Sequence, residues 1–308
     1  MRALVTGASG FVGKFLVEHL VAEKDQVLGT TLTSAAAGLP CETVRLDITD
    51  AVATAQIVSA YKPEVIYHLA GQAFVPEAEN DFGRAISTNV AGTNNVFRVA
   101  HLMQQKIKLL LVSSAEVYGK VTARELPLNE QTPLRPQNNY SLSKGMAEMV
   151  AERYARHGHI EAVIVRPFNH IGPGQNNRFV ASSFAHQLAL IARGKSPPVI
   201  TVGNLDARRD FTDARDIVRG YRLAMIKGQG TYNFGSGHSL PIRELLQCLI
   251  QACGLDVRIE QDPARMRPSE IPEVYGSIEK AKRDLGWEPK CSINDTLREI
   301  YEYWRDRV

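Results

Sequence analysis

The sequence has few cysteines and no long apolar run, and both features exclude whole classes of protein. Its 308 residues include four cysteines, in no CxxC or Cys/His ligand spacing: Cys41, Cys248, Cys253 and Cys291. This pattern argues against a zinc site or a disulfide framework and favours packed thiols, so we expect no bound metal. No stretch approaches the ~20 continuous apolar residues that a membrane-spanning helix needs.

Charge of one sign is also scarce. The formal net charge is +3, from 36 Lys and Arg against 33 Asp and Glu, which is too mild to indicate a nucleic-acid partner. The first residues show no basic segment followed by a long apolar segment and a cleavage site, so a cytoplasmic location is expected. With 44% hydrophobic and 22% charged residues, the composition is that of an ordinary soluble globular protein.

Short apolar runs alternate with helical patterns through the first half of the chain. The runs are "RALVT", "QVLGTT", "TVRL", "EVIYHLA", "IKLLLVSS" and "EAVIVRP". They are apolar nearly throughout, which is typical of buried parallel strands. The alternation predicts an α/β protein with a Rossmann-type, doubly wound parallel sheet that is covered by helices on both faces.

The second half changes character at "RPFNHIGPGQNN", which is rich in Pro, Gly and Asn and is predicted to be a loop. Helical and strand-like segments follow it. We therefore expect a dinucleotide-binding domain from residues 1–166 and about 217–237. A smaller, discontinuous α/β substrate-binding lobe is expected from about 167–216 and 238–308.

Three glycines lie between the first strand and the first helix: Gly7, Gly10 and Gly13. In this position one glycine permits a sharp turn, another lets the backbone approach a pyrophosphate, and the last lets the helix pack on the strand. The helix N-terminus offers free N–H groups to the phosphates. The stretch thus predicts a dinucleotide site, with Phe11 and Val12 at the start of the helix.

The choice of dinucleotide depends on the end of the second strand. There an acidic residue would accept the ribose hydroxyls of NAD, but the stretch from Gly29 to Ser34 contains none. Its absence removes a repulsion of the 2′-phosphate and favours NADP(H). Because no basic residue is present in this stretch either, NAD(H) stays open.

The segment "YSLSK" places Tyr140 and Lys144 at the start of a predicted helix. Residues i and i+4 share a helix face, and a nearby ammonium is expected to lower the pKa of the phenol from about 10. Tyr140 is therefore a candidate general acid or base. Upstream, a buried strand ends in Ser113 and Ser114, at the sheet edge where ligands of α/β proteins gather.

The glycine loop, the serines and the Tyr–Lys pair, in this order, resemble the extended short-chain dehydrogenases/reductases. The likeness covers essentially the whole chain and includes "RLDITD", "HLAG" and "RDLGWEPK". It implies that Ser114, not Ser113, is the catalytic hydroxyl, and that a homodimer forms through helices around 90–105 and 140–157. It also implies further cofactor contacts from Asp47 and Ile48 beside the adenine and from Leu69, Ala70 and Gly71 at a strand end.

Three later stretches resemble enzymes of GDP-6-deoxyhexose synthesis: "RPFNHIGPGQ", "VGNLDARRDFTDARD" and "RMRPSEIPEVYGS". The likeness is greatest to reductases of GDP-4-keto-6-deoxy-D-mannose, which make GDP-D-rhamnose, and it implies a GDP-linked 6-deoxyhexose as substrate. The planar guanidinium of arginine suits the diphosphate. For Arg208, however, we expect only solvent exposure, and for His170 a structural or cofactor-packing role. The expected substrate contacts are Arg209 and Arg267 to phosphate, Glu270 to ribose, Asn169 to the sugar-phosphate and Val180 at the base.

Reductase and dehydratase activities use the same cofactor site and the same tyrosine. The dehydratases of the family carry Thr-Asp-Glu or Thr-Ser-Glu where this chain has Ser114-Ala115-Glu116. The difference favours reduction of the C4 ketone with Tyr140 as proton donor, and leaves Glu116 as a substrate contact or a sign of residual dehydration. The C4 configuration of the product stays open. Another nucleotide-sugar epimerase or dehydratase, or a non-catalytic dinucleotide-binding protein, is an alternative.

Overall fold

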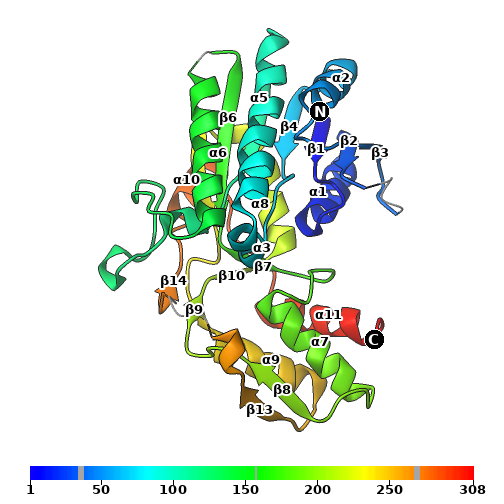
Figure 1. Ribbon diagram of the computed structural model, residues 1–308, viewed down its shortest axis with the longest axis vertical. Helices are drawn as coiled ribbons and strands as arrows, with labels where there is room; N and C mark the ends of the chain where they lie inside the picture. Colours follow the sequence, from blue (N-terminus) through cyan, green and yellow to red (C-terminus); the bar gives the residue numbers. More distant parts are fainter. Residues whose placement is uncertain (34–37, 157, 267–270) are drawn as a thin grey trace.

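A seven-stranded parallel sheet forms the centre of the computed structural model, which describes residues 1–33, 38–156, 158–266 and 271–308 (Figure 1). The strand order is β11-β6-β5-β4-β1-β2-β3. Chain order reverses between β1 and β4, which creates the crevice where such sheets bind ligands. The predicted Rossmann-type sheet is therefore confirmed. The strands are β1 (Arg2–Thr6), β2 (Gln26–Thr31), β3 (Glu42–Arg45), β4 (Val65–His68), β5 (Ile107–Val112), β6 (Ile160–Pro167) and β11 (Gly230–Phe234).

Helices cover both faces of this sheet because neighbouring strand residues point to opposite sides. On β1, Val5 belongs to one core and Leu4 to the other. The core around Val5 is shared with α1 (Phe11–Ala22), α8 (Ala214–Lys227) and α10 (Glu279–Leu285). The core around Leu4 is shared with α2 (Ala51–Tyr61), α5 (Thr93–Leu102) and α6 (Asn139–Ala155).

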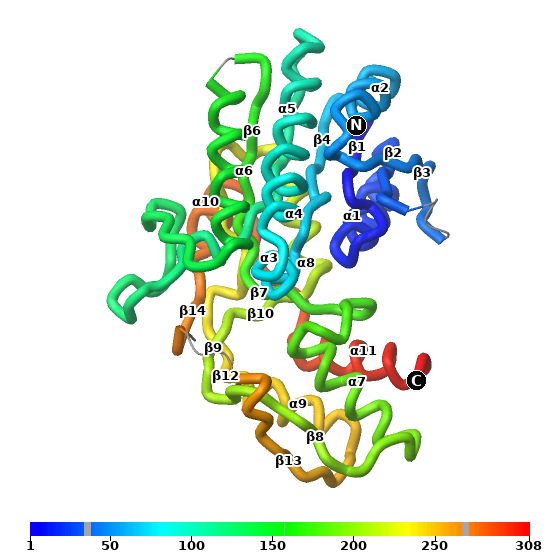
Figure 2. Tube along the Cα trace, in the orientation of Figure 1, coloured from blue at the N-terminus to red at the C-terminus, as the bar shows by residue number. Residues whose placement is uncertain are grey.

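A separate group of elements lies beyond the carboxyl ends of the strands (Figures 1 and 2). Its own core contains Phe184, Leu246 and Ile300, with Trp304 packed against it. Segments far apart in the sequence build it, so this smaller lobe is discontinuous. The elements are α7 (Val180–Ala192), α9 (Ile242–Cys253) and α11 (Ile293–Arg305), with the parallel pair β8 (Val199–Val202) and β13 (Arg258–Gln261).

Shorter elements complete the fold. In the described ranges no helix is long and apolar enough to span a bilayer. Several of the shorter elements carry polar residues that are described below. They are α3 (Val75–Asn80), α4 (Phe82–Ile86), a π-helix (Ser87–Gly92), 3₁₀ turns (Ala115–Tyr118, Ala123–Glu125, Pro263–Arg265) and the strands β9 (Arg208–Arg209), β12 (Leu240–Pro241) and β14 (Glu273–Val274).

The stretch "RPFNHIGPGQNN" was predicted to be a loop, but part of it forms a strand. Within it, β7 (Asn169–Ile171) pairs in parallel with β10 (Phe211–Asp213). The partner strand lies about forty residues further along the chain, so local composition carried no sign of this pairing. Tertiary context overrides the weak strand propensity of Asn and His.

Residues 279–287 pack on the main sheet. Ala281, Leu285 and Trp287 belong to the core that α1 and α8 share, although the predicted division assigned 238–308 to the smaller lobe. The division of the chain into two domains stays a prediction, and this packing favours counting residues 279–287 with the sheet.

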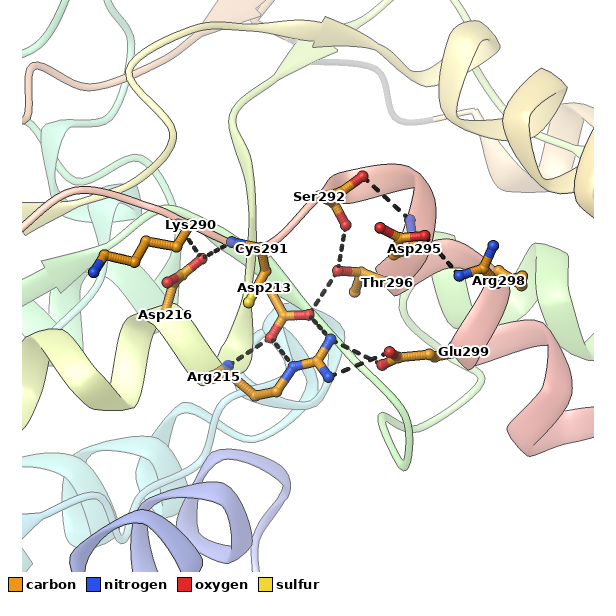
Figure 3. Close-up of polar contacts among 10 residues, drawn as sticks. All are labelled: Asp213, Arg215, Asp216, Lys290, Cys291, Ser292, Asp295, Thr296, Arg298 and Glu299. Carbon is orange, nitrogen blue, oxygen red and sulfur yellow. Dashed lines mark hydrogen bonds and ion pairs between the residues drawn. The ribbon is translucent and has the colours of Figure 1, made fainter. Parts of the chain in front are cut away.

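A cluster of charged residues ties the C-terminal segment to the start of α8 (Figure 3). Asp213 caps the helix and accepts hydrogen bonds from Arg215 Nη2 (2.7 Å) and Thr296 Oγ1 (2.6 Å). Asp216 accepts the backbone amides of residues 290 and 291, each at 2.8 Å. Arg215 also pairs with Glu299 at 2.8 Å. We call these residues, Asp213, Arg215, Asp216, Thr296 and Glu299, the α8 cluster.

Candidate active site

The glycine loop is pressed against the end of β4. Gly7 has φ +73°, and a Cβ there would lie 2.8 Å from the amide nitrogen of Ala70. A Cβ on Gly13 would lie 2.2 Å from the carbonyl oxygen of Gly7. Both positions therefore need glycine, and the first turn of α1 contains no acidic residue. This bare backbone at a helix N-terminus fits the pyrophosphate of a dinucleotide.

His68 joins the ends of β1 and β4. Its Nδ1 hydrogen-bonds Thr6 Oγ1 at 2.7 Å, and its Nε2 hydrogen-bonds Thr93 Oγ1 at 3.0 Å. Burial, assisted by the charge of Lys144, lowers the pKa of His68 to about 3. The imidazole is thus neutral and acts as a fixed spacer beneath the crevice. The sequence offered no signal for this role, because nothing in it pairs His68 with threonines 62 and 25 residues away.

Asn89 lies in the π-helix and fixes the backbone that follows β4. Its Nδ2 donates to Ser143 Oγ at 2.9 Å, and its Oδ1 accepts the amide of Gln72 at 2.8 Å. A Cβ on Gly71 would meet that oxygen at 2.8 Å. Leu69, Ala70 and Gly71, which are predicted cofactor contacts, therefore form a rigid rim beside the glycine loop.

The two serines after β5 point in different directions. The hydroxyl of Ser113 is buried and donates to a carboxylate oxygen of Glu148. The hydroxyl of Ser114 accepts the amide of Glu116 at 3.2 Å, and its interaction with the Tyr140 hydroxyl lowers the pKa of that phenol. Of the two serines, Ser114 is thus the one that reaches the tyrosine.

Tyr140 opens α6, where Asn138 caps the helix by accepting the amide of Ser141 at 2.7 Å. Tyr140 is 8% exposed. Burial raises the pKa of Tyr140 to about 12, the interaction with Ser114 lowers it, and the charge of Glu116 raises it further. The predicted lowering of this pKa by Lys144 is wrong, because desolvation of the phenolate dominates.

Lys144 is buried one helical turn beyond Tyr140. Its Nζ donates to the carbonyl oxygen of Val112 at 2.6 Å and lies 3.7 Å from the position of a Cβ on Gly71. Burial lowers the pKa of Lys144 to about 8, whereas Glu148 raises it. The ammonium therefore faces the rim of the crevice and is held by a strand end.

A buried ion pair supports this helix from below. Arg166 Nη2 meets Glu148 Oε2 at 2.6 Å, and the two side chains are 5% and 1% exposed. Arg166 also donates to the Tyr118 hydroxyl at 3.1 Å, and that hydroxyl donates to Asn233 Oδ1 at 2.7 Å. We call Ser113, Tyr118, Glu148, Arg166 and Asn233 the α6 cluster. No local pattern predicts this cluster, since its members come from five separate segments.

Asp47 and Ile48 follow β3 at the outer part of the sheet edge. Asp47 is exposed and accepts the amide and the hydroxyl of Thr49, at 2.9 and 2.7 Å. Those bonds lower the pKa of Asp47, which stays ionised. Ile48 is buried, and a Cβ on Gly92 would clash with it at 2.6 Å. The pair is thus held firmly where an adenine contact is predicted.

On the side of the smaller lobe, His170 stacks on Phe11 of the glycine loop. The rings are 6.2 Å apart and parallel within 1°, and His170 Nδ1 hydrogen-bonds the Phe168 carbonyl at 3.0 Å. Burial lowers the pKa of His170. This neutral, stacked imidazole suits the packing role expected of it. Asn169 is exposed beside it, at the start of β7.

Solvent exposure was predicted for Arg208, but its side chain has partners on two neighbouring segments. Its Nε lies 3.1 Å from Glu273 Oε1 and 3.0 Å from Ser239 Oγ, so it joins β9 to β14 and to the segment before β12. Arg209 is half-buried next to it and donates to the Arg208 carbonyl at 2.9 Å. Val180 begins α7. The remaining predicted contacts, Arg267 and Glu270, lie outside the described residues. Within the described ranges, no three His, Cys, Asp or Glu side chains are placed to hold a metal ion.

Known proteins resemble this chain over its full length. It is 35% identical to the GDP-6-deoxy-D-mannose reductase of Pseudomonas aeruginosa, with 100% of this chain and 98% of the relative covered. It is 32% identical to the GDP-6-deoxy-D-talose 4-dehydrogenase of Aggregatibacter actinomycetemcomitans, with 98% and 97% covered. Both relatives are named as oxidoreductases of GDP-linked sugars.

Solved structures of nucleotide-sugar enzymes also resemble this chain over its full length. The structure of RMD from Pseudomonas aeruginosa complexed with NADPH superposes with a TM-score of 0.88 at 32% identity, and 100% of both chains is covered. The UDP-glucose 4-epimerase of Thermus thermophilus in complex with NAD gives 0.90 at 25% identity, also with 100% of both chains covered. The family model described as GDP-mannose 4,6 dehydratase matches residues 4–300. The chain therefore belongs to the GDP-mannose 4,6-dehydratase family, an oxidoreductase-like group of extended short-chain dehydrogenases/reductases that bind a nicotinamide dinucleotide.

Proposed function

We propose that this protein uses NADP(H) to reduce the C4 ketone of GDP-4-keto-6-deoxy-D-mannose, giving GDP-D-rhamnose or its C4 epimer. The observation that carries the proposal is that Ser114 lies near enough to Tyr140 to lower the pKa of its phenol, whereas Ser113 is bound to Glu148. With its pKa raised to about 12, Tyr140 carries its proton at neutral pH, as the donor in a ketone reduction must. The full-length likeness to a GDP-6-deoxy-D-mannose reductase supports the choice of substrate.

The residues would divide the chemistry as follows. A reduced nicotinamide dinucleotide, when bound, supplies the hydride for C4 of the sugar. Ser114 donates a hydrogen bond to the carbonyl oxygen, and Tyr140 transfers its phenolic proton to the developing alkoxide. Lys144 keeps a positive charge near the resulting tyrosinate until water returns the proton. The negative charge thus develops against donors that are already in place, which is where most catalytic power lies.

The chain's own backbone would hold most of the cofactor. Gly7, Gly10 and Gly13, with Phe11 and Val12, would receive the pyrophosphate at the start of α1. Asp47 and Ile48 would border the adenine, and the rim from Leu69 to Gly71 would border the nicotinamide half, where Lys144 binds ribose. The first turn of α1 contains no acidic residue, and its free backbone amides fit such an anion. NADP(H) is favoured because one solved relative binds NADPH.

The GDP-sugar would lie between this edge and the smaller lobe. Its diphosphate carries two negative charges. The planar guanidinium of Arg209 can bind two phosphate oxygens at once, so it suits this group. Asn169, exposed at the start of β7, would hold the sugar-phosphate. The rest of the predicted set is Val180 at the base, with Arg267 and Glu270 outside the described residues.

A dehydratase is the second candidate, because Glu116 lies close enough to raise the pKa of Tyr140. An exposed carboxylate near the catalytic tyrosine is the group that a dehydration at C5 and C6 requires. Ala115 beside it has no functional group, which favours the reductase. In that case Glu116 contacts the substrate.

We also propose that the enzyme is a cytoplasmic homodimer that joins through α5 and α6. Three large apolar side chains are exposed on α6, at positions that share one helical face: Leu142, Met146 and Met149. On α5, Leu102 is 64% exposed. A second copy would cover these side chains. Sedimentation of the purified protein tests this, and a monomer at micromolar concentration would contradict it.

The reaction is tested by mixing purified protein with GDP-4-keto-6-deoxy-D-mannose and either NADPH or NADH. We expect stoichiometric loss of the reduced cofactor, with Tyr140→Phe slowed by about 10²–10⁴-fold. NMR of the sugar product identifies the C4 epimer. Ser114→Ala should lose most activity, and Ser113→Ala should retain more at equal folded content.

Two results would contradict the reductase. A keto-sugar formed from GDP-mannose alone, with no oxidation of either reduced cofactor, identifies a dehydratase and moves Glu116 to the centre of the mechanism. Cofactor binding without turnover of either sugar identifies a non-catalytic dinucleotide-binding protein.

A further inference from the structure

The end of β2 is uncharged, and its neighbour β3 ends in an arginine. From residue 26 to residue 44 the sequence contains one charged residue, Glu42, at the opposite end of β3. Arg45 is the last residue of β3 and pairs in register with Thr31, the last residue of β2. Adjacent strands lie about 4.8 Å apart. An arginine side chain is longer than this spacing, so Arg45 can cover the end of β2.

Arg45 also lies on the face of the sheet that carries the glycine loop. A Cβ on Gly29 would meet Ala8 Cβ at 2.8 Å, and the side chains of Cys41 and Thr43 at 3.4 Å. Cys41 and Thr43 therefore point to the side of Ala8. Side chains alternate along a strand, so Arg45, two residues after Thr43, points to that side too.

Backbone hydrogen bonds fix these pieces together. The amide of Ala8 donates to the Thr30 carbonyl at 2.9 Å, and the amide of Leu46 donates to the Thr31 carbonyl at 2.8 Å. The glycine loop, the end of β2 and the residue after Arg45 thus form one rigid edge. A dinucleotide with its pyrophosphate at the glycine loop would place its adenosine ribose over the end of β2.

The guanidinium of Arg45 is available to a ligand. The residue is exposed, and its side chain forms no hydrogen bond or ion pair with any other described residue. Its charge acts on Asp47, whose carboxylate is already bonded to Thr49. Arg84 on α4 also acts on Asp47, and it too is exposed. Two exposed arginines thus act on the single carboxylate of Asp47, so Asp47 alone does not neutralise them.

We propose that Arg45 binds the 2′-phosphate of NADP(H) and so determines the preference of this enzyme for NADP(H) over NAD(H). A guanidinium forms short, charge-assisted hydrogen bonds to phosphate oxygens, and a ribose 2′-hydroxyl gains little from it. This inference rests on the proposed function only for the binding of a nicotinamide dinucleotide; it does not depend on the sugar. It also supplies the cation that the stretch from Gly29 to Ser34 lacks.

Isothermal titration calorimetry tests the proposal with NADPH, NADH, 2′,5′-ADP and 5′-AMP as probes. For Arg45→Ala we expect NADPH and 2′,5′-ADP to bind about tenfold to a hundredfold more weakly, with NADH and 5′-AMP within about twofold of wild type. Arg45→Lys keeps the charge without the fork and should fall between. Arg84→Ala is the matched control and should leave the ratio of NADPH to NADH affinity unchanged.

Three results would overturn the proposal. They are an equal loss of NADPH and NADH affinity in Arg45→Ala, a selective loss in Arg84→Ala instead, or tighter binding of NADH than of NADPH by the wild-type protein. Circular dichroism of each variant separates a binding defect from unfolding. Selective NADPH binding without reduction of the keto-sugar would leave this inference intact and contradict the proposed function alone.

Discussion

The α6 cluster and the α8 cluster both contain buried carboxylates, but water reaches their arginines to different extents. In the α6 cluster, Arg166 is 5% exposed and Glu148 is 1% exposed. In the α8 cluster, Arg215 is 42% exposed although its partner Asp213 is 1% exposed. Both clusters stabilise carboxylates that folding removes from water. They differ in what is left when one partner is removed.

This difference predicts which cluster tolerates change. A charge that is left alone in a closed interior costs several kcal/mol, whereas an exposed arginine regains water when its partner is lost. The α6 cluster also includes Ser113, which follows β5 beside Ser114, and its Glu148 acts on Lys144, so its geometry is transmitted to the crevice. The α8 cluster instead holds the C-terminal segment to the sheet.

The largest effect is expected from Glu148→Ala. It leaves the guanidinium of Arg166 buried without its partner and should lower the free energy of unfolding by about 3–5 kcal/mol, measured by urea denaturation. Glu152→Ala on the same helix is the control, because its ion pair with Arg156 is long, at 3.9 Å, and largely exposed. Similar losses in the two variants would remove the distinction between closed and open pairs.

A smaller effect is expected from Asp216→Ala. The change removes the acceptor of two backbone amides at residues 290 and 291, and should cost about 1–3 kcal/mol in the same urea assay. Glu288→Ala alters an exposed acid in the same segment, whose pair with Lys282 spans 3.5 Å, and should change little. A loss as large as that of Glu148→Ala would show that the α8 cluster is no less critical.

The smallest effect is expected from Arg215→Ala. Asp213 keeps the hydroxyl of Thr296 and the amide of residue 215, so the unfolding free energy should fall by about 1 kcal/mol or less. Raising the salt concentration should shrink the difference from wild type, since Arg215 is partly in solvent. A loss above about 3 kcal/mol would contradict the comparison.

The sheet, the glycine loop and the Tyr140–Lys144 pair can be predicted from the sequence because the residues that determine them are close together in the chain. Gly7, Gly10 and Gly13 stand in one turn, and Tyr140 and Lys144 stand one helical turn apart, so spacing alone brings each set together. The order of the strands follows from alternation with helices and from the few connections that parallel sheets allow.

Other features depend on register and burial, which spacing does not reveal. Burial, not Lys144, dominates the pKa of Tyr140. Arg45 comes beside Thr31 only through the pairing of β2 with β3. Arg208 meets Glu273 from 65 residues away. These residues required the tertiary structure, because each depends on partners that no local pattern identifies.

The two tryptophans of the chain lie in different cores, and this gives the protein two optical reporters. Trp287 is fully buried against the main sheet and donates its indole N–H to the Asp216 carbonyl at 2.9 Å. Trp304 packs against the core of the smaller lobe and donates to Ser182 at 2.7 Å. Because the sequence contains no other tryptophan, replacing either one by phenylalanine leaves a single emitter. Fluorescence can then follow the loosening of each core separately as ligands are added.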